Sequence, residues 1–315
     1  MAKGSSKIVL IGNGAVGSTF AYTVLLKGLA NELVIIDVNQ NKAEGDVLDL
    51  NHGLLLASPM KITAGCFADC ANADIIVVTA GAAQKEGETR LALMNRNVKI
   101  FESIIRQVVQ YNTDGILLIA TNPVDILTQV ALKLSEWPKQ RVFGSGTLLD
   151  SSRFRYLVAE KFGVDPRSVH GMIIGEHGDS EVALWSSLYI AGVGVNQRQP
   201  GSPWHLTDEQ KNEIYNETRM AAYKIIEKKG ATYYAIALAL ARICEAILKD
   251  QKSILPVSSY LENYHGIDGV CLGVPSIVGR NGVEQVIPMA LTIEEEQNLQ
   301  QSATTLKKFL HEIGF

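Results

Sequence analysis

A glycine-rich turn near the N-terminus is the first group of residues that could do chemistry. The residues Gly12-Asn13-Gly14-Ala15-Val16-Gly17 follow the apolar run 8–11 and precede a segment of helical composition. In a strand–turn–helix unit the first glycine permits a tight turn, the second lets backbone amides approach a pyrophosphate, and the third brings helix and strand together. The turn therefore predicts a dinucleotide site, with a purely structural strand–helix turn as the alternative.

An acidic residue at the appropriate distance supports the dinucleotide interpretation. Asp37 lies 20 residues after Gly17, at the end of the apolar run 33–36. A carboxylate there can bond both hydroxyls of an adenosine ribose and would repel a ribose 2′-phosphate. The predicted cofactor is therefore NAD and not NADP.

A histidine in a polar, glycine-flanked run is the second candidate. His177 lies in Gly175-Glu176-His177-Gly178-Asp179-Ser180, where the glycines permit close approach of a ligand. An imidazole gains and loses a proton near neutral pH, so His177 could act as a general acid and base. Taken alone, such a histidine is more often structural than catalytic.

Buried parallel strands must position these groups. The runs 8–11, 33–36, 74–79 and 115–120 are apolar without polar alternation, as in strands buried on both faces. Apolar residues between the last two runs recur at steps of three and four, which predicts a one-sided helix. We predict an α/β fold with a Rossmann-type, doubly wound parallel sheet, followed by an α+β domain.

The alternation of short apolar runs with helical segments ends near Gly144. We therefore predict a dinucleotide-binding domain over residues 1–144 and a second domain over residues 145–315. A helix is expected from Asp150 to Phe162, and capping boxes at Thr207 and Thr292 predict two more. We expect part of a helix around 234–252 to pack back on the first domain.

Two loops at the carboxyl ends of the predicted strands carry polar residues, and ligands of such sheets bind there. Thr79-Ala80-Gly81 opens one loop, which continues to Arg90 and is long enough for a mobile lid. In the other loop, Pro123 restricts Asn122 to an extended conformation that could aim its amide at a ligand. The alternatives are a solvated loop and an ordinary turn.

The composition excludes several classes of partner. Lys and Arg total 29 and Asp and Glu total 33, a net charge of −4, so no basic excess points to nucleic acid or to an anionic membrane. We expect no membrane span and no signal peptide. The four cysteines show neither metal-ligand nor disulfide spacing, which predicts reduced thiols, no metal and a cytoplasmic protein.

Five separated motifs give the chain an end-to-end resemblance to the L-lactate dehydrogenases, and five in order are far more specific than one. The motifs are Gly12–Gly17, Gln84 with Gly87-Glu88-Thr89-Arg90, Thr121-Asn122-Pro123-Val124-Asp125, Leu149-Asp150-Ser151-Ser152-Arg153-Phe154-Arg155 and Gly175–Ser180. This resemblance favours the catalytic interpretation of His177.

The resemblance implies reversible hydride transfer between NADH and pyruvate, with L-lactate as the product. His177 would donate the proton, Asp150 would orient its imidazole, and Arg153 would grip the substrate carboxylate with two parallel N–H groups. Arg90 would polarise the reacting carbonyl. The resemblance further implies substrate contacts at Asn122 and Thr232 and cofactor contacts at Gly12–Gly17, Asp37, Thr79, Gly81 and Asn122.

Gln84 bears on which 2-hydroxy acid is the substrate. Malate dehydrogenases carry arginine at this position, where it pairs with the second carboxylate of oxaloacetate, whereas a neutral amide suits the methyl group of pyruvate. The alternatives are a larger, hydroxyisocaproate-type substrate, malate itself, or a non-catalytic NAD-binding sensor or structural protein.

Arg155 and His170 match positions that bind fructose 1,6-bisphosphate across a subunit interface in bacterial lactate dehydrogenases. The resemblance therefore implies a homotetramer in which clustered cations from two chains repel one another until the anion binds. The alternative is that Arg155 is a surface residue and His170 a strand-end residue.

Overall fold

The computed structural model of the chain describes residues 6–82 and 90–315. Gln84, most of the predicted lid and the side chain of Arg90 lie outside the described residues.

The first half of the chain forms the predicted parallel sheet. Its strand order is β3-β2-β1-β4-β5-β6, and every neighbouring pair in this series is parallel. This order is that of a doubly wound dinucleotide-binding fold, so the predicted fold class is confirmed. The strands are β1 (Lys7–Ile11), β2 (Glu32–Ile36), β3 (Lys61–Ala64), β4 (Ile75–Val78), β5 (Ile116–Ile119) and β6 (Val142–Gly144).

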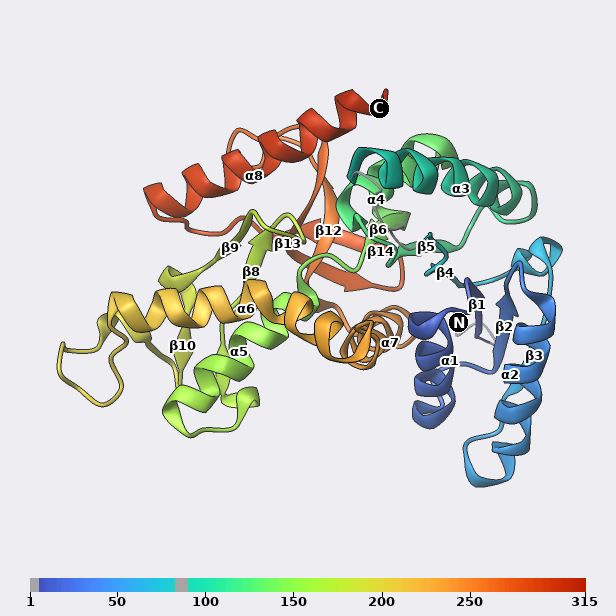
Figure 1. Cartoon of the computed structure of the whole chain (residues 1–315), viewed down its shortest axis with the longest axis horizontal. Helices are drawn as coiled ribbons and strands as arrows, with labels where there is room; N and C mark the ends of the chain where they lie inside the picture. The colour runs from blue at the N-terminus through green and yellow to red at the C-terminus, as the bar shows by residue number, and fades with distance from the viewer. Residues whose placement is uncertain (1–5, 83–89) are drawn as a thin grey trace.

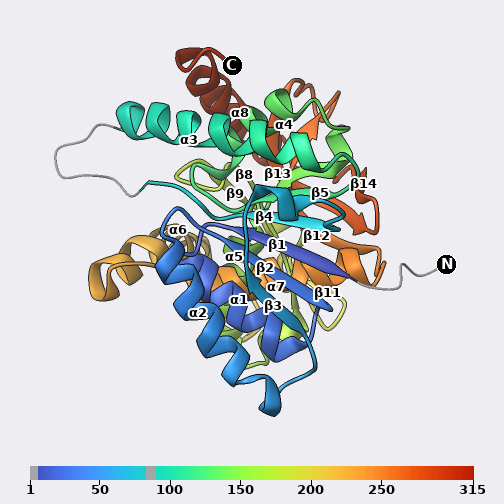
Figure 2. The same ribbon diagram turned by 90° about the vertical axis from the view of Figure 1, so that its right-hand side faces the viewer.

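Helices cover both faces of this sheet (Figure 2). Ile8 and Leu10 face one apolar cluster, whereas Val9 and Ile11 face the other. Alternate side chains thus enter different cores, which explains why the runs lack polar alternation. Helices α1 and α2 pack in the first cluster and α3 and α4 in the second. The helices are α1 (Ala15–Lys27), α2 (Gln40–His52), α3 (Arg90–Tyr111) and α4 (Val124–Ser135).

Most strands of the second half of the chain extend the same sheet. Strand β12 pairs antiparallel with β6, and the sheet continues through β13 to β8 and β9, with β14 beside β13. A smaller sheet has the order β11-β10-β7. The strands are β7 (Val169–His170), β8 (Ile173–Gly175), β9 (Glu181–Ala183), β10 (Tyr189–Ile190), β11 (Val193–Gly194), β12 (Ser253–Leu261), β13 (Val270–Gly279) and β14 (Gly282–Val286).

The helices of the second half complete the described part of the fold (Figure 1). The capping boxes at Thr207 and Thr292 form as predicted, since each hydroxyl accepts a backbone N–H from the third residue of its helix. Helix α7 packs against α1 of the first half. The helices are α5 (Leu148–Phe162), α6 (Asp208–Lys229), α7 (Tyr234–Leu248) and α8 (Ile293–Glu312).

Short 3-10 helices connect several of these elements. They span Leu54–Leu56, Phe67–Cys70, Lys139–Arg141, Pro166–Ser168, Trp185–Ser187 and Val195–Gln197. Within residues 6–82 and 90–315, no helix has the length and apolar character needed to cross a membrane.

The glycine-rich turn between β1 and α1 is tightly packed. Gly12 has a φ of +101°, and a Cβ on Gly17 would lie 2.0 Å from the carbonyl oxygen of Gly12. At Gly14, by contrast, a Cβ would meet nothing within 4 Å. The helix can approach the end of β1 this closely only because position 17 lacks a side chain.

Alanine at two of these glycines should therefore have different effects. Gly17→Ala forces a methyl group into the Gly12 carbonyl, and we expect the free energy of unfolding to fall by about 2–3 kcal/mol. Gly14→Ala should cost less, about 1 kcal/mol or below: alanine is a poorer N-cap residue than glycine, but the position is open and its φ of −71° suits alanine. Urea titrations measure both. Equal stability of the two variants would contradict the role of Gly17 in helix packing.

Candidate active site

The glycine turn leaves the N-terminus of α1 open. Gly14 is the N-cap residue of α1, and no side chain caps the helix. The space beside Gly14 is open, since a Cβ there would meet nothing within 4 Å, so the first amides of α1 can reach a ligand. Free N–H groups and the positive end of the helix dipole suit a phosphate anion. The turn therefore fits the pyrophosphate of a dinucleotide.

Asp37, at the end of β2, is tied directly to this turn. Its Oδ2 accepts the backbone N–H of Asn13 at 2.5 Å, and its Oδ1 accepts the N–H of Asn39 at 2.8 Å. The side chain of Asn13 instead donates to Asp46 on α2 at 2.7 Å. Asn13 therefore binds Asp37 through its backbone and α2 through its side chain.

The two loops after β4 and β5 lie against the same turn and against each other. Thr79 donates its hydroxyl to the carbonyl oxygen of Gly12 at 2.7 Å, and a Cβ on Gly81 would meet the side chain of Thr121 at 2.3 Å. Asn122 is exposed and precedes Pro123 through a cis peptide bond. These predicted residues therefore gather at the carboxyl edge of the parallel strands.

Buried Asn97 on α3 joins the two loops, and the sequence analysis missed it. Its Oδ1 accepts the N–H of Ala82 at 2.8 Å, and its Nδ2 donates to the carbonyl oxygen of Asn122 at 3.3 Å. In sequence it is one polar residue on a helix with no motif around it, so no signal pointed to it.

Asp150 and Arg153 lie one turn apart on α5, and His177 follows β8. Asp150 Oδ2 lies 2.5 Å from His177 Nδ1, while Asp150 Oδ1 accepts an N–H of Arg153 at 2.9 Å. The Asp150 side chain is 3% exposed. A single buried carboxylate therefore holds both the imidazole and the guanidinium that the sequence singled out.

The charges in this cluster shift the pKa values of His177 and Asp150. Burial alone would lower the pKa of His177, but the charge of Asp150 and its hydrogen bond outweigh burial and raise the pKa to about 9. Burial opposes the ionisation of Asp150, yet the attraction of His177 and Arg153 holds its pKa below the usual value. At neutral pH the pair is an imidazolium beside a carboxylate.

Two further buried carboxyl groups lie near this pair. Asp125, on the first turn of α4, is 2% exposed, and burial raises its pKa to about 6. Glu181 on β9 is 4% exposed, and burial followed by the charge of Asp150 raises its pKa to about 8. The sequence analysis gave neither a role, because burial of a lone carboxyl depends on elements distant in the chain.

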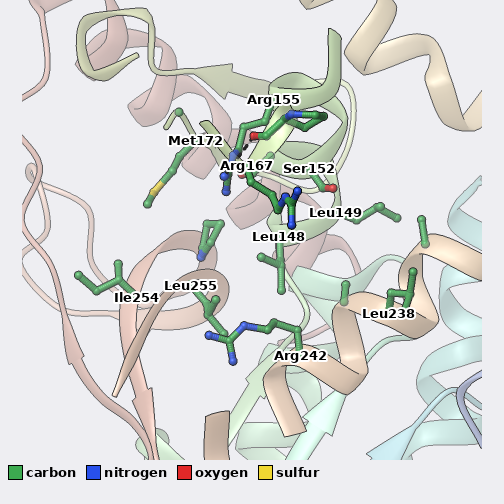
Figure 3. A pocket seen from close by; sticks show the side chains of 16 residues that line it. Leu148, Leu149, Ser152, Arg155, Arg167, Met172, Leu238, Arg242, Ile254 and Leu255 are labelled. Carbon is green, nitrogen blue, oxygen red and sulfur yellow. Dashed lines mark hydrogen bonds between the residues drawn. The ribbon is translucent and has the colours of Figure 1, made fainter. Parts of the chain in front are cut away.

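The remaining predicted residues lie apart from this cluster. Thr232 is half-buried in the link between α6 and α7, and no hydrogen bond in the described part of the chain joins it to His177 or Arg153. Arg155 faces a separate pocket of about 410 Å³, around which Arg167 and Arg242 also lie (Figure 3). His170 is exposed on β7 and does not line that pocket.

A doubly wound sheet with an open, glycine-lined helix N-terminus defines the class of dinucleotide-binding proteins. Residues 6–144 match the family model "lactate/malate dehydrogenase, NAD binding domain". Residues 147–314 match "lactate/malate dehydrogenase, alpha/beta C-terminal domain". The chain belongs to the lactate/malate dehydrogenase family.

Individual relatives agree with the family models. The chain is 53% identical over 311 residues to L-lactate dehydrogenase 1 of Clostridium acetobutylicum, with 99% of each chain covered. It is 52% identical over 306 residues to L-lactate dehydrogenase of Acetivibrio thermocellus, with 96% of each covered.

Solved structures show the same similarity. The minor L-lactate dehydrogenase from Enterococcus mundtii, in its ligands-bound form, has a TM-score of 0.95 and 43% identity, with 98% of each chain covered. A lactate dehydrogenase from a Medee basin deep-sea metagenome library has a TM-score of 0.95 and 40% identity, with 98% of this chain and 99% of that chain covered.

The raised pKa of His177 predicts how stability depends on pH. The folded pKa is about 9 against an ordinary 6.5, so the interaction with Asp150 stabilises the fold fully below pH 6.5 and is lost as the pH rises through 9. Between about pH 6 and 9.5, the unfolding free energy should fall by on the order of 2–3 kcal/mol more in the wild type than in His177→Gln.

Urea titrations of both proteins across this range measure the difference. Both proteins are compared in a Glu181→Gln background, because the pKa of Glu181 also lies in this range and is itself lowered by the charge of His177. Parallel pH dependences would show that Asp150 does not favour the protonated imidazole.

Proposed function

We propose that the chain is an NAD-dependent L-lactate dehydrogenase that interconverts pyruvate and L-lactate. The observation that carries the proposal is the single Asp150 carboxylate bonded to both His177 and Arg153. A proton donor and a carboxylate anchor are the two groups needed to bind and reduce a 2-oxo acid. Because Asp125 holds the backbone of His177 from the first turn of α4, which follows the loop after β5, this cluster is attached to the edge of the sheet at which dinucleotides bind.

In the proposed reaction the bound reduced nicotinamide supplies the hydride to the carbonyl carbon of pyruvate. His177 donates a proton to the carbonyl oxygen from Nε2, because Asp150 holds Nδ1. Asp150 stabilises the imidazolium before the transfer and fixes the orientation of the ring. In the reverse direction, neutral His177 accepts the hydroxyl proton of lactate.

Arg153 anchors the substrate in this proposal. Asp150 engages one of its N–H groups, and a guanidinium has five, so two parallel donors remain for the substrate carboxylate. Arg90, Asn122 and Thr232 are proposed to complete the substrate site: Arg90 polarises the carbonyl, Asn122 bonds its oxygen, and Thr232 lines the methyl side.

The proposed cofactor contacts follow from the turn. Within the turn Gly12–Gly17, the amides at the start of α1 bind the pyrophosphate, because the N–H groups of Gly12 and Asn13 are bonded to Ile36 and Asp37. Thr79, Gly81 and Asn122 border the cofactor along the neighbouring loops. Each carboxylate oxygen of Asp37 accepts one backbone N–H, which leaves lone pairs for the ribose hydroxyls. We further propose that the dinucleotide-binding domain spans residues 1–144 and the second domain residues 145–315, which the ranges of the two family models support.

The proposed substrate can be tested by mixing the purified chain with NADH and either pyruvate or oxaloacetate. We expect kcat/KM for pyruvate to exceed that for oxaloacetate, because Gln84 offers no positive charge to a second carboxylate. Gln84→Arg should shift the ratio toward oxaloacetate by on the order of a thousandfold. Loss of nicotinamide absorbance measures both rates.

Gln84→Met is the matched control, since it has similar length and no charge. It should gain no oxaloacetate activity. An unchanged ratio in Gln84→Arg would show that another residue selects the substrate. No turnover of pyruvate by the wild type, with turnover of a larger 2-oxo acid, would favour the hydroxyisocaproate-type alternative; no turnover at all would favour a non-catalytic NAD-binding protein.

We also propose that fructose 1,6-bisphosphate activates the protein and that it assembles as a homotetramer. Burial lowers the pKa of Arg155, and its described contact is a hydrogen bond to the carbonyl oxygen of Pro166 at 3.4 Å. A half-buried guanidinium without a carboxylate partner among the described residues is stabilised by a phosphate group. Leu55 and Leu56 are 93% and 89% exposed after α2, which supports burial of this surface in an assembly.

The effector should lower the KM for pyruvate several-fold near neutral pH, and Arg155→Gln should remove this effect. Arg167→Gln is the matched control: Arg167 lines the same pocket but is exposed and ion-paired to Asp165 at 2.6 Å, so its loss should matter little. Steady-state kinetics with and without the bisphosphate, alongside light scattering for assembly, measure the outcome. If the KM of the wild type for pyruvate is the same with and without the bisphosphate, the bisphosphate is not an effector of this protein.

A further inference from the structure

Asp125 is a buried carboxylate that joins three distant parts of the chain. It lies on the first turn of α4 and its Oδ2 accepts the backbone N–H of His177 at 2.8 Å. Its Oδ1 accepts the hydroxyl hydrogen of Ser258, on β12, at 2.5 Å. Ser258 is fully buried, so the contact is shielded from water. The backbone of His177 is therefore fixed by a group that the proposed reaction does not use directly.

The negative charge of Asp125 needs an explanation. No lysine or arginine within residues 6–82 and 92–315 forms an ion pair with it, and burial raises its pKa to about 6 despite two hydrogen bonds. An amide of the same shape could hold the same two partners without the cost of burying a charge. A carboxylate here thus suggests that the charge itself is used.

The charge acts on His177. The ionisable groups that influence the imidazole are Asp150 and Arg153 from α5, Asp125 from α4 and Glu181 from β9. Asp125 itself faces His177 and Glu176 from the loop after β8, Ser258 from β12 and Cys271 from β13. Of the charged groups around His177, Asp150 and Asp125 both raise the pKa of the imidazole, whereas Arg153 lowers it.

We propose that Asp125 is a positioning residue for His177: it fixes the backbone of the proton donor, and its negative charge helps to keep the imidazole protonated. The inference rests on the proposed function, because it assigns Asp125 a part in supplying the proton to the 2-oxo acid. Two carboxylates thus act on one imidazole. Asp150 bonds the ring, whereas Asp125 bonds the backbone N–H and stabilises the protonated ring through its negative charge.

Asp125→Asn separates charge from shape. The amide oxygen can accept the N–H of His177 while the amide nitrogen donates to Ser258, so both hydrogen bonds survive and only the charge is lost. Loss of a nearby negative charge should lower the pKa of His177. Because pyruvate reduction needs the protonated imidazole, the alkaline limb of kcat/KM should move to lower pH by about half a unit to one unit.

Ser258→Ala is the matched control. It removes one hydrogen bond to Asp125 and so raises the pKa of the carboxyl above about 6, but the carboxylate is still charged near pH 9, where His177 titrates, so the alkaline limb should stay in place. A limb that moves equally in Ser258→Ala and Asp125→Asn would mean that local packing, and not charge, is responsible, and would overturn the proposal.

A second readout does not depend on turnover. Diethyl pyrocarbonate modifies neutral imidazole, and mass spectrometry of the peptide containing His177 gives the extent of modification at each pH. The pH at which half of His177 is modified should be lower in Asp125→Asn than in the wild type. If this pH is the same in both proteins, the proposal is overturned. If Asp125→Asn fails to fold, Asp125→Ser, which is also neutral, carries the same expectation. Failure of the wild type to reduce pyruvate would contradict the proposed function alone, since the modification midpoint still tests Asp125.

Discussion

The site depends on one interaction, the buried carboxylate of Asp150 held between an imidazole and a guanidinium. Burying this charge is unfavourable unless both partners are present, and the carboxylate in turn raises the pKa of His177 and keeps its imidazole charged. The spacing is set by the helix, because Asp150 and Arg153 lie one turn apart on α5 and reach the same side. Helix geometry therefore fixes the distance between Asp150 and Arg153, and the bond from Asp150 to Nδ1 of His177 brings the imidazole to the same carboxylate.

The rest of the fold brings this cluster to the sheet. Parallel strands end at a common edge, where the glycine turn, Thr79 and the loop containing Asn122 meet. Because Asp125 follows that loop and accepts the backbone N–H of His177, the edge of the first half is bonded to the second half at the residue that carries the imidazole. In the proposed reaction, this bond would hold the substrate-binding residues of the second half at a fixed separation from the cofactor-binding edge of the first.

The sequence predicted features that depend on local pattern. Unbroken apolar runs predicted the parallel strands because each strand supplies two cores, and the capping boxes at Thr207 and Thr292 predicted where helices begin. The cluster of Asp150, Arg153 and His177 came from resemblance, since a lone histidine is ambiguous. Asp125, Asn97 and the pairing of β6 with β12 were missed, because burial and pairing between residues far apart in the chain leave no local pattern.

The pairing of β6 with β12 also determines how the chain can be divided. Cutting near residue 145 would leave β6 as an open edge, with unpaired backbone groups ready to associate with other chains. It would also strip α7 from α1 and expose the apolar surface around Phe20 and Val24. The regions matched by the two family models therefore share one continuous sheet and are not independent modules. A design that transplants the first half into another scaffold must supply a substitute for both β12 and α7.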